Sequence, residues 1–242
     1  MHRHSYHDVL ALLGESSAHP GGFAATVKLL SRAGLRPGMK VLDAGCGTGR
    51  TACYVAEQYG CEVTGIDRHP LMIEKARRRA ELAGIKVEWV CGDVRRLPFP
   101  DASFDAVLIE SVTVFVPGDE AIREYARVTK PGGQTIDLEL CARGAVPQQQ
   151  IAELYGAAQL PSAAEWTRLY ENGGFAKVRL LRNSRLSMQQ SVQSEIDYPD
   201  RFRLPSDDAL RQSFITEALV RNSLFLAEYG NRIGFVAIRA VR

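Results

Sequence analysis

The amino-acid sequence predicts an α/β protein built around a doubly wound, parallel sheet. Short apolar strands alternate with helical segments between residues 22 and 140, which is the pattern of such a sheet. Right-handed connections between the strands then place helices on both of its faces. The chain has 242 residues, of which 45% are apolar and 24% charged, so it can bury a substantial core without disulfides or metal ions.

Local signals mark five strands and four helices in the first part of the chain. The first helix ends at Gly34, the second ends at Gly60, and the third has Pro70 at its first position. In chain order we expect a helix at 22–34, a strand at 39–45, a helix at 50–60, a strand at 61–67, a helix at 70–84, strands at 85–93 and 103–111, a helix at 118–130 and a strand at 132–140.

After residue 142 the regular alternation ends. Residues 184–230 look like an insertion between two strands, which could act as a lid or as a dimer contact. Residues 1–35 are expected to form a helical cap, so that residues 1–242 make one domain. The expected elements are a helix at 162–175, a strand at 176–183, an irregular polar stretch at 184–205, an amphipathic helix at 206–230 with Ser206 as its N-cap, and a strand at 231–242.

An acidic residue stands at or near the end of each of the first five strands. Ligands of doubly wound sheets bind outside the carboxyl ends of the strands, so these side chains should line one cleft. The five acids are Asp43, Asp67, Asp93, Glu110 and Asp137.

The glycine-rich loop "LDAGCGTGR" follows the first strand and indicates which ligand the cleft holds. Its spacing is Gly45-x-Gly47-x-Gly49 followed by Arg50, so it lacks the third glycine of a dinucleotide fingerprint and the G-K-[ST] of a Walker A loop. Asp43 would repel a pyrophosphate but suits a cation. S-adenosylmethionine carries an ammonium and a sulfonium, and the loop amides can bind its carboxylate.

The next two acids suit the other half of the same ligand. Asp67 can accept hydrogen bonds from both ribose hydroxyls, and Asp93 can accept one from the adenine amino group. Met72 could cover the adenine ring. An acid at a strand end often only caps the following helix, but three such acids in order beside this loop favour a cofactor site.

Three stretches of the sequence resemble the class I S-adenosylmethionine-dependent methyltransferases. They are "VLDAGCGTGRTACYVAEQYGCEVTGIDRHPLMIEKARRRA", "CGDVRRLPFPDASFDAVLIES" and "VTKPGGQTIDLEL", and they are most like small-molecule enzymes of the ubiquinone/menaquinone-biosynthesis and sterol methyltransferase type. The resemblance implies a Rossmann-like sheet of seven strands with the last one antiparallel, methyl transfer to a small molecule, and S-adenosylhomocysteine as product. It assigns the methionine end of the cofactor to Asp43, Gly45, Cys46, Gly47, Thr48 and Gly49, the ribose to Asp67, and the adenine to Asp93 and Val94. Arg68 and Met72 are further candidate cofactor contacts.

The acceptor side of the cleft is less clearly marked. Glu110 could position the acceptor, act as a base, bind a backbone amide or contact the cofactor, and His19 is a candidate proton acceptor. Gly22, at the end of the segment "HPGG", offers an amide that could approach the cofactor carboxylate. Ser111, Phe115 and Tyr6 are candidate substrate contacts.

Composition limits the alternatives. The net charge is only +2 and no apolar run reaches the roughly 18 residues of a membrane span, so neither a nucleic acid nor a membrane is an expected partner. Five scattered cysteines favour neither disulfides nor zinc. Glu110, Asp137 and Glu139 could together bind a divalent metal ion, but no metal is expected. We expect a cytoplasmic enzyme. A methyltransferase for RNA or protein, or a regulatory protein that only binds S-adenosylmethionine, remains an alternative.

Overall fold

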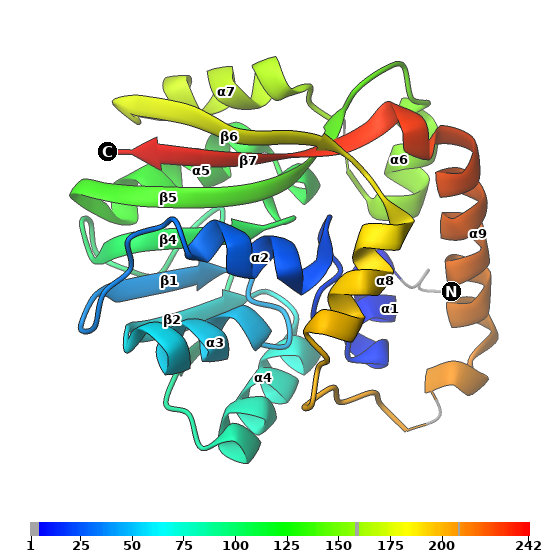
Figure 1. The fold of residues 1–242 in the computed structure, drawn as a ribbon, viewed down its shortest axis with the longest axis horizontal. Coiled ribbons are helices and arrows are strands. Elements are labelled where there is room, and N and C mark those ends of the chain that lie inside the picture. The colour runs from blue at the N-terminus through cyan, green and yellow to red at the C-terminus, as the bar shows by residue number, and fades with distance from the viewer. Residues whose placement is uncertain (1–4, 158–159, 208) are drawn as a thin grey trace.

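A mixed sheet forms the centre of the computed structural model, which describes residues 5–157, 160–207 and 209–242 (Figure 1). Its seven strands lie in the order β3-β2-β1-β4-β5-β7-β6. Neighbours among the first five strands are parallel, whereas β7 is antiparallel to both β5 and β6. This confirms the predicted fold class. The strands are β1 (Lys40–Ala44), β2 (Glu62–Asp67), β3 (Glu88–Cys91), β4 (Phe104–Glu110), β5 (Thr129–Ala142), β6 (Lys177–Arg185) and β7 (Ile233–Val241).

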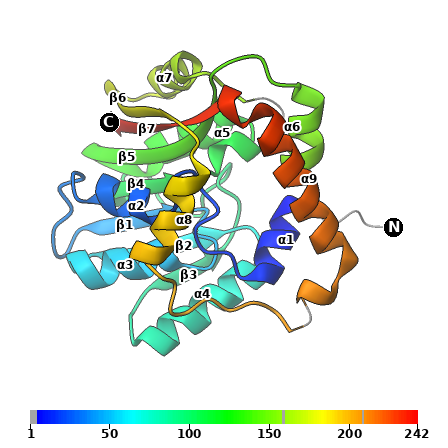
Figure 2. The same cartoon turned by 45° about the vertical axis from the view of Figure 1, so that its right-hand side comes forward.

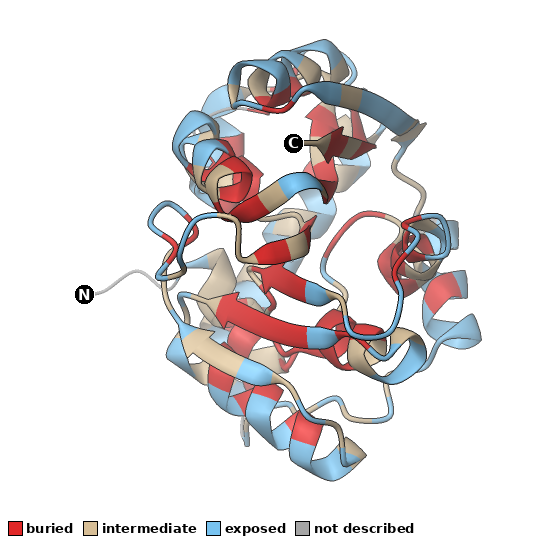
Figure 3. Ribbon diagram, turned by 90° about the vertical axis from the view of Figure 1, so that its left-hand side faces the viewer, coloured by how far each residue is buried: buried red, intermediate tan, exposed pale blue. Residues whose placement is uncertain are grey.

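Helices cover both faces of the sheet, because neighbouring residues of each strand point to opposite sides. On β1, Val41 packs with the core beneath α2 (Gly22–Leu30) and α3 (Arg50–Tyr59). The next residue, Leu42, packs with the core beneath α5 (Gly118–Val128) and α7 (Ala163–Asn172). Figure 3 shows the buried strands between these two layers of helices. The helix α4 (Pro70–Ala83) packs beside β3.

The remaining helices gather at the end of the sheet where β1 to β5 finish (Figures 1 and 2). Among the residues that the structure describes, no helix has the length and apolar character needed to cross a membrane. The helices at this end are α1 (Tyr6–Leu13), α6 (Gln148–Tyr155), α8 (Met188–Asp197) and α9 (Ser213–Tyr229), with three short 3₁₀ turns, η1 (Thr113–Phe115), η2 (Ala209–Arg211) and η3 (Gly230–Arg232).

The prediction of an irregular stretch at 184–205 is wrong, because these residues contain the end of β6 and the whole of α8. The sequence of α8 is mostly polar, so it carries little helical periodicity. Two contacts stabilise the helix. Ser187 caps it by accepting a hydrogen bond from the Gln190 amide, and the buried Ser194 hydroxyl accepts one from the Ala24 amide at the start of α2.

The helix expected to begin at Ser206 begins later, at Ser213. Ser206 is not its N-cap, since its hydroxyl lies 3.1 Å from the ammonium nitrogen of Lys75 on α4. Lys75 also donates to the carbonyl of Leu204 at 2.6 Å. The chain between α8 and η2 is therefore tied to α4 instead of extending α9.

A buried ion pair secures the same stretch to the cofactor loop. Arg79 on α4 donates to both carboxylate oxygens of Asp200, at 2.6 and 2.7 Å, and both side chains are only 4% exposed. Arg79 also donates to the carbonyl of Thr48 at 2.8 Å, and the Ser16 hydroxyl donates to Asp200 at 2.6 Å. Although burial raises the pKa of Asp200, the hydrogen bonds from Arg79 and Ser16 lower it to about 2. One ion pair thus joins four segments of the chain.

We predict that Asp200→Asn lowers the free energy of unfolding by about 3 to 5 kcal/mol, because it leaves the buried Arg79 guanidinium without a counter-charge. Urea denaturation followed by circular dichroism measures this change. The matched control is Glu81→Gln, which removes an exposed partner of Arg78 and should change stability by less than about 1 kcal/mol. Equal effects of the two substitutions would contradict the structural role given to Asp200.

Candidate active site

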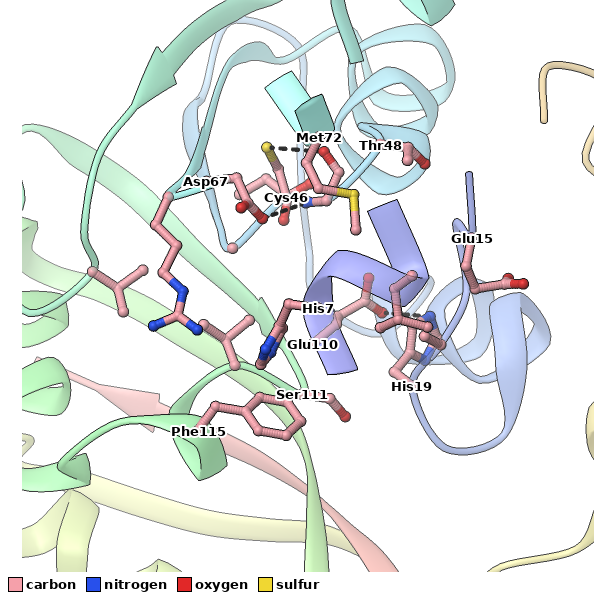
Figure 4. Close-up of a pocket in the computed structure, with 18 of the residues that line it drawn as sticks. His7, Glu15, His19, Cys46, Thr48, Asp67, Met72, Glu110, Ser111 and Phe115 are labelled. Carbon is pink, nitrogen blue, oxygen red and sulfur yellow. Dashed lines mark hydrogen bonds and ion pairs between the residues drawn. The ribbon is translucent and has the colours of Figure 1, made fainter. Parts of the chain in front are cut away.

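A cleft opens at the carboxyl ends of β1, β2 and β4, where the sequence placed the site (Figure 4). Cys46, Asp67 and Met72 lie on one side of it, and Ser111 and Phe115 lie on the other. Two candidates, Gly22 and Gly49, are not among the described residues that line it. The candidates that do line it are Tyr6, His19, Asp43, Gly45, Cys46, Gly47, Thr48, Asp67, Arg68, Met72, Asp93, Val94, Glu110, Ser111 and Phe115.

The first glycine of the loop allows the end of β1 to approach the turn after β4. Gly45 has a φ of +77°, and a Cβ atom there would lie 2.3 Å from Cγ2 of Val112. A side chain would therefore need both a strained backbone and space that Val112 occupies. The loop is anchored to β2, since the amides of Gly45 and Cys46 both donate to the carbonyl of Ile66.

Gly49 has a packing role, and its predicted cofactor contact stays a prediction. It is the N-cap of α3, and a Cβ atom there would lie 2.4 Å from the ring of Trp89. Gly22, whose cofactor contact also stays a prediction, has a packing role of its own. It is buried against Ser194 of α8, and its amide donates to the carbonyl of His19 at 3.2 Å.

Asp43 is a buried carboxylate with an unsatisfied oxygen. Its residue is 3% exposed, and Oδ2 has no hydrogen-bond partner in the part of the chain that the structure describes. Burial raises its pKa well above the ordinary value, and the nearby charge of Glu110 raises it further. A cationic ligand would supply the missing partner and favour the ionised form. The site therefore suits a ligand that carries positive charge.

Asp67 lies at the other end of the loop with room for further hydrogen bonds. Its Oδ2 accepts from the Gly47 amide at 2.9 Å, and its Oδ1 accepts from the His69 amide at 2.8 Å. Each carboxylate oxygen has two lone pairs, so each can still accept from a hydroxyl. Burial raises its pKa. The carboxylate is thus fixed by two backbone amides in an orientation that suits a vicinal diol.

Asp93 is placed at the rim of the cleft by an ion pair. Arg95 donates to both of its oxygens, at 3.0 and 2.6 Å, and the Asp93 side chain is 32% exposed. The next residue, Val94, is buried and adds an apolar surface. Met72 is buried on α4 and also lines the cleft. This end of the site can therefore cover a flat ring and offer one carboxylate at its edge.

Glu110 is held by hydroxyl groups from two helices. The Thr26 hydroxyl donates to its Oε1, and the Thr51 hydroxyl donates to its Oε2 at 2.6 Å. These partners contradict the alternative that Glu110 binds a backbone amide.

His19 is connected to the same network. Its Nε2 lies 3.3 Å from the Thr26 oxygen and 3.8 Å from Oε1 of Glu110. The single hydroxyl proton of Thr26 is given to Glu110, so Thr26 can only accept, and Nε2 of His19 must be the protonated nitrogen. Its other nitrogen, Nδ1, is buried and has no partner among the described residues. In the neutral ring Nδ1 then has a free lone pair, which is what a proton acceptor needs.

The wall opposite the loop is shaped by the turn after β4. Ser111 adopts a left-handed conformation with a φ of +55°, which is uncommon for a residue with a side chain. The amides of Val112 and Thr113 donate to Oε1 of Glu139 at 2.8 and 2.6 Å. Glu139 thereby positions Val112 against Gly45 and sets the start of η1, which carries Phe115.

The three carboxylates that could have formed a metal site bind separate groups. Glu139 accepts from backbone amides, Asp137 accepts from the Tyr170 hydroxyl at 2.5 Å, and Glu110 accepts from two threonines. Burial raises the pKa of Asp137 well above its usual range and raises that of Glu139 to about 7. Within the described residues, no group of three or more His, Cys, Asp or Glu side chains could hold a metal ion.

Sequence reasoning missed several residues of the site. His7 lies on α1 with its ring 4.6 Å from that of Phe115, and burial lowers its pKa to about 4, so it is neutral. Tyr155 on α6 packs edge-on against Tyr6 at 5.2 Å. Neither helix was predicted individually. The capping box formed by Ser5 and Asp8 was a readable signal for α1.

Comparisons with known proteins agree with this site. Residues 41–133 match the model of a methyltransferase domain family. An uncharacterised methyltransferase, YodH of Bacillus subtilis, is 34% identical over 195 residues, which are 79% of this chain and 83% of YodH. The chain therefore belongs to the class I S-adenosylmethionine-dependent methyltransferases. It is an enzyme of that class, whose methyl donor is S-adenosylmethionine.

Two solved structures show the same fold. The [4+2]-cyclase SpnF has a TM-score of 0.69 and 25% identity, over 90% of this chain and 79% of SpnF. Phosphoethanolamine N-methyltransferase 2 of Haemonchus contortus, solved with S-adenosylmethionine, has a TM-score of 0.75 and 19% identity, over 98% of this chain and 57% of that protein. SpnF is named as a cyclase, so the fold alone does not define the reaction.

We predict that Glu139→Gln changes how stability depends on pH. The native state keeps the Glu139 proton up to a pH of about 7, whereas the unfolded chain releases it near 4.5. In the wild type, Glu139 therefore contributes fully to the free energy of unfolding below pH 4.5. About 3 kcal/mol of this contribution is lost as the pH rises through 7. The variant should lack this loss, since its amide oxygen can still accept both hydrogen bonds. Parallel pH profiles of unfolding free energy would contradict the assignment.

Proposed function

We propose that this protein transfers a methyl group from S-adenosylmethionine to a small-molecule acceptor in the cleft. The observation that carries the proposal is the buried, unpartnered oxygen of Asp43 beside the glycine-rich loop. Bound in the cleft, S-adenosylmethionine would supply a methyl group already activated by its sulfonium.

Different residues would bind different parts of the cofactor. Asp43 would attract its positively charged end, and Asp67 would accept hydrogen bonds from the ribose hydroxyls. Met72, Val94 and Asp93 would hold the adenine. Most of these side chains are fixed by backbone hydrogen bonds or packing in the free protein, so binding should need little rearrangement of this part of the site.

Glu110 and His19 would act on the acceptor side. Glu110 accepts from Thr26, which orients the imidazole of His19 and leaves Nδ1 free to take a proton from the acceptor. Cys46, Thr48, Arg68, Ser111, Phe115 and Tyr6 would complete the walls around the two ligands.

A small acceptor is favoured over RNA or protein because the cleft is covered by the chain itself. Tyr6, Glu15 and Ser16 of the N-terminal segment line it. The cofactor cavity has a volume of about 160 Å³, which is below the roughly 300 Å³ of an ordinary ligand pocket. The free thiols of Cys46, Cys53, Cys61, Cys91 and Cys141 support a reducing, cytoplasmic location.

This small volume supports a lid formed by the N-terminal segment, whose residues Tyr6, Glu15 and Ser16 line the cleft. In this proposal the N-terminal segment moves outward to admit the cofactor and closes again to exclude water. We expect S-adenosylhomocysteine to slow amide hydrogen exchange in residues 5–18, with little change in α7, which lies away from the cleft. If S-adenosylhomocysteine does not alter amide hydrogen exchange in residues 5–18, the segment packs on the cleft without moving, and the lid is contradicted.

Binding and turnover test the function together. Calorimetry should show S-adenosylhomocysteine binding to the protein and no binding of NAD or ATP. Asp67→Ala should weaken that binding by roughly 2 to 4 kcal/mol, because two ribose hydroxyls lose a charged acceptor. The control is Asp105→Asn, which pairs with Lys130 outside the cleft and should leave the affinity unchanged.

Methyl transfer itself is measured by incubating the protein with methyl-labelled S-adenosylmethionine and a cellular metabolite extract. We expect label in a small-molecule product. Label in RNA or protein, or binding with no transfer at all, would contradict the proposal.

A further inference from the structure

A second cavity adjoins the cofactor cleft and has no part in the cofactor contacts. Its volume is about 330 Å³, within the range of small-molecule pockets. Six residues line both cavities, so the two are separated only by shared walls: Tyr6, Ala18, His19, Phe115, Leu140 and Tyr155.

The walls of the second cavity are mainly apolar and come from distant parts of the chain. Among the described residues that line it, none is Asp, Glu, Lys or Arg. A phosphate or carboxylate placed there would lose its hydration without gaining a counter-charge, which is costly. The aliphatic lining includes Ile151 of α6, Leu160, Leu186, Leu226 of α9 and Ile233 of β7.

The polar groups in the cavity are few and mostly paired. The Tyr155 hydroxyl donates to Oδ1 of Asn222 at 2.5 Å, and the Ser191 hydroxyl donates to the carbonyl of Ser187. His19 differs from them, because its Nδ1 is buried without a partner among the described residues and its side chain is only 6% exposed. This nitrogen belongs to one of the six residues that line both the second cavity and the cofactor cleft.

We propose that the second cavity binds an uncharged, largely apolar acceptor that carries a hydroxyl group, with that hydroxyl at Nδ1 of His19. The inference rests on the proposed function and specifies its substrate class. The acceptor oxygen gains the methyl group, its proton passes to Nδ1 of His19, and the bond from that methyl to the sulfonium sulfur breaks, leaving a neutral thioether. Leu140 and Phe115 would keep the apolar body of the acceptor beside the cofactor.

Two matched pairs of probes test the acceptor class by calorimetry on the complex with S-adenosylhomocysteine. The pairs are geraniol with geranyl diphosphate and 1-naphthol with 1-naphthyl phosphate, and each contrasts an uncharged with an anionic form of the same apolar body. We expect at least one uncharged member to bind at least about tenfold more tightly than its anionic partner. Tighter binding of the anionic members, or no binding of either alcohol, would overturn the inference.

A matched pair of variants locates the binding. Leu226→Arg puts a charge into the cavity and should weaken binding of the alcohol at least about tenfold. Leu224→Arg, on the same helix but 66% exposed, should change it less than about twofold. A variant that still binds S-adenosylhomocysteine is folded. If Leu226→Arg is not folded, Leu226→Trp replaces it, because tryptophan fills the cavity without adding a charge. If neither substitution at Leu226 weakens binding of the alcohol, the alcohol does not bind in the second cavity and the proposed site is contradicted.

The role of His19 is tested separately from the cavity. The wild type should bind 1-naphthol about tenfold more tightly than naphthalene, and His19→Phe should abolish that preference. A preference that survives would show that another group receives the hydroxyl. If S-adenosylhomocysteine does not bind the wild type, the proposed function fails; if it binds and the alcohols do not, only the acceptor class fails.

Discussion

The contact between Gly45 and Val112 is the constraint on which both halves of the site depend. A methyl group at Gly45 would overlap Val112, so the end of β1 and the turn after β4 can approach only because residue 45 has no side chain. Val112 is held in turn by Glu139, whose carboxylate accepts its amide hydrogen. Because β1 and β4 are also paired neighbours in the sheet, the cofactor loop and the wall that carries Phe115 follow from two adjacent strands and meet at this close packing contact.

The acids of the chain show how environment decides the role of a carboxylate. Asp200 is buried with Arg79 and ties a peripheral segment to the cofactor loop. Asp137 is buried against a tyrosine, which orients it within the core. Asp43 is buried beside the loop with an oxygen unsatisfied, and Asp67 lines the cleft with lone pairs to spare. Only the last two are placed to meet a ligand, although the sequence presents all of them as similar residues.

The sheet and the cofactor half of the site were predictable because their signals are local. Apolar strands, glycine loops and strand-end acids occur at fixed spacings, so Asp43, Gly45 and Asp67 could be placed in the cleft without a structure. The helices α6 and α8 could not be derived in the same way. The helix α8 depends on Ser194, which meets the start of α2 across the fold. The packing roles of Gly22 and Gly49 could not be predicted either, because they depend on Ser194 and Trp89, which are distant in sequence.

A crystal structure of the complex with S-adenosylhomocysteine would test the account most directly. We expect the ligand's ammonium near Oδ2 of Asp43, its ribose on Asp67, and its sulfur facing the shared wall formed by His19 and Phe115. The contact between Gly45 and Val112 should be preserved. A sulfur atom directed toward solvent, or an adenosyl group lying in the second cavity, would contradict the arrangement of cofactor and acceptor described here.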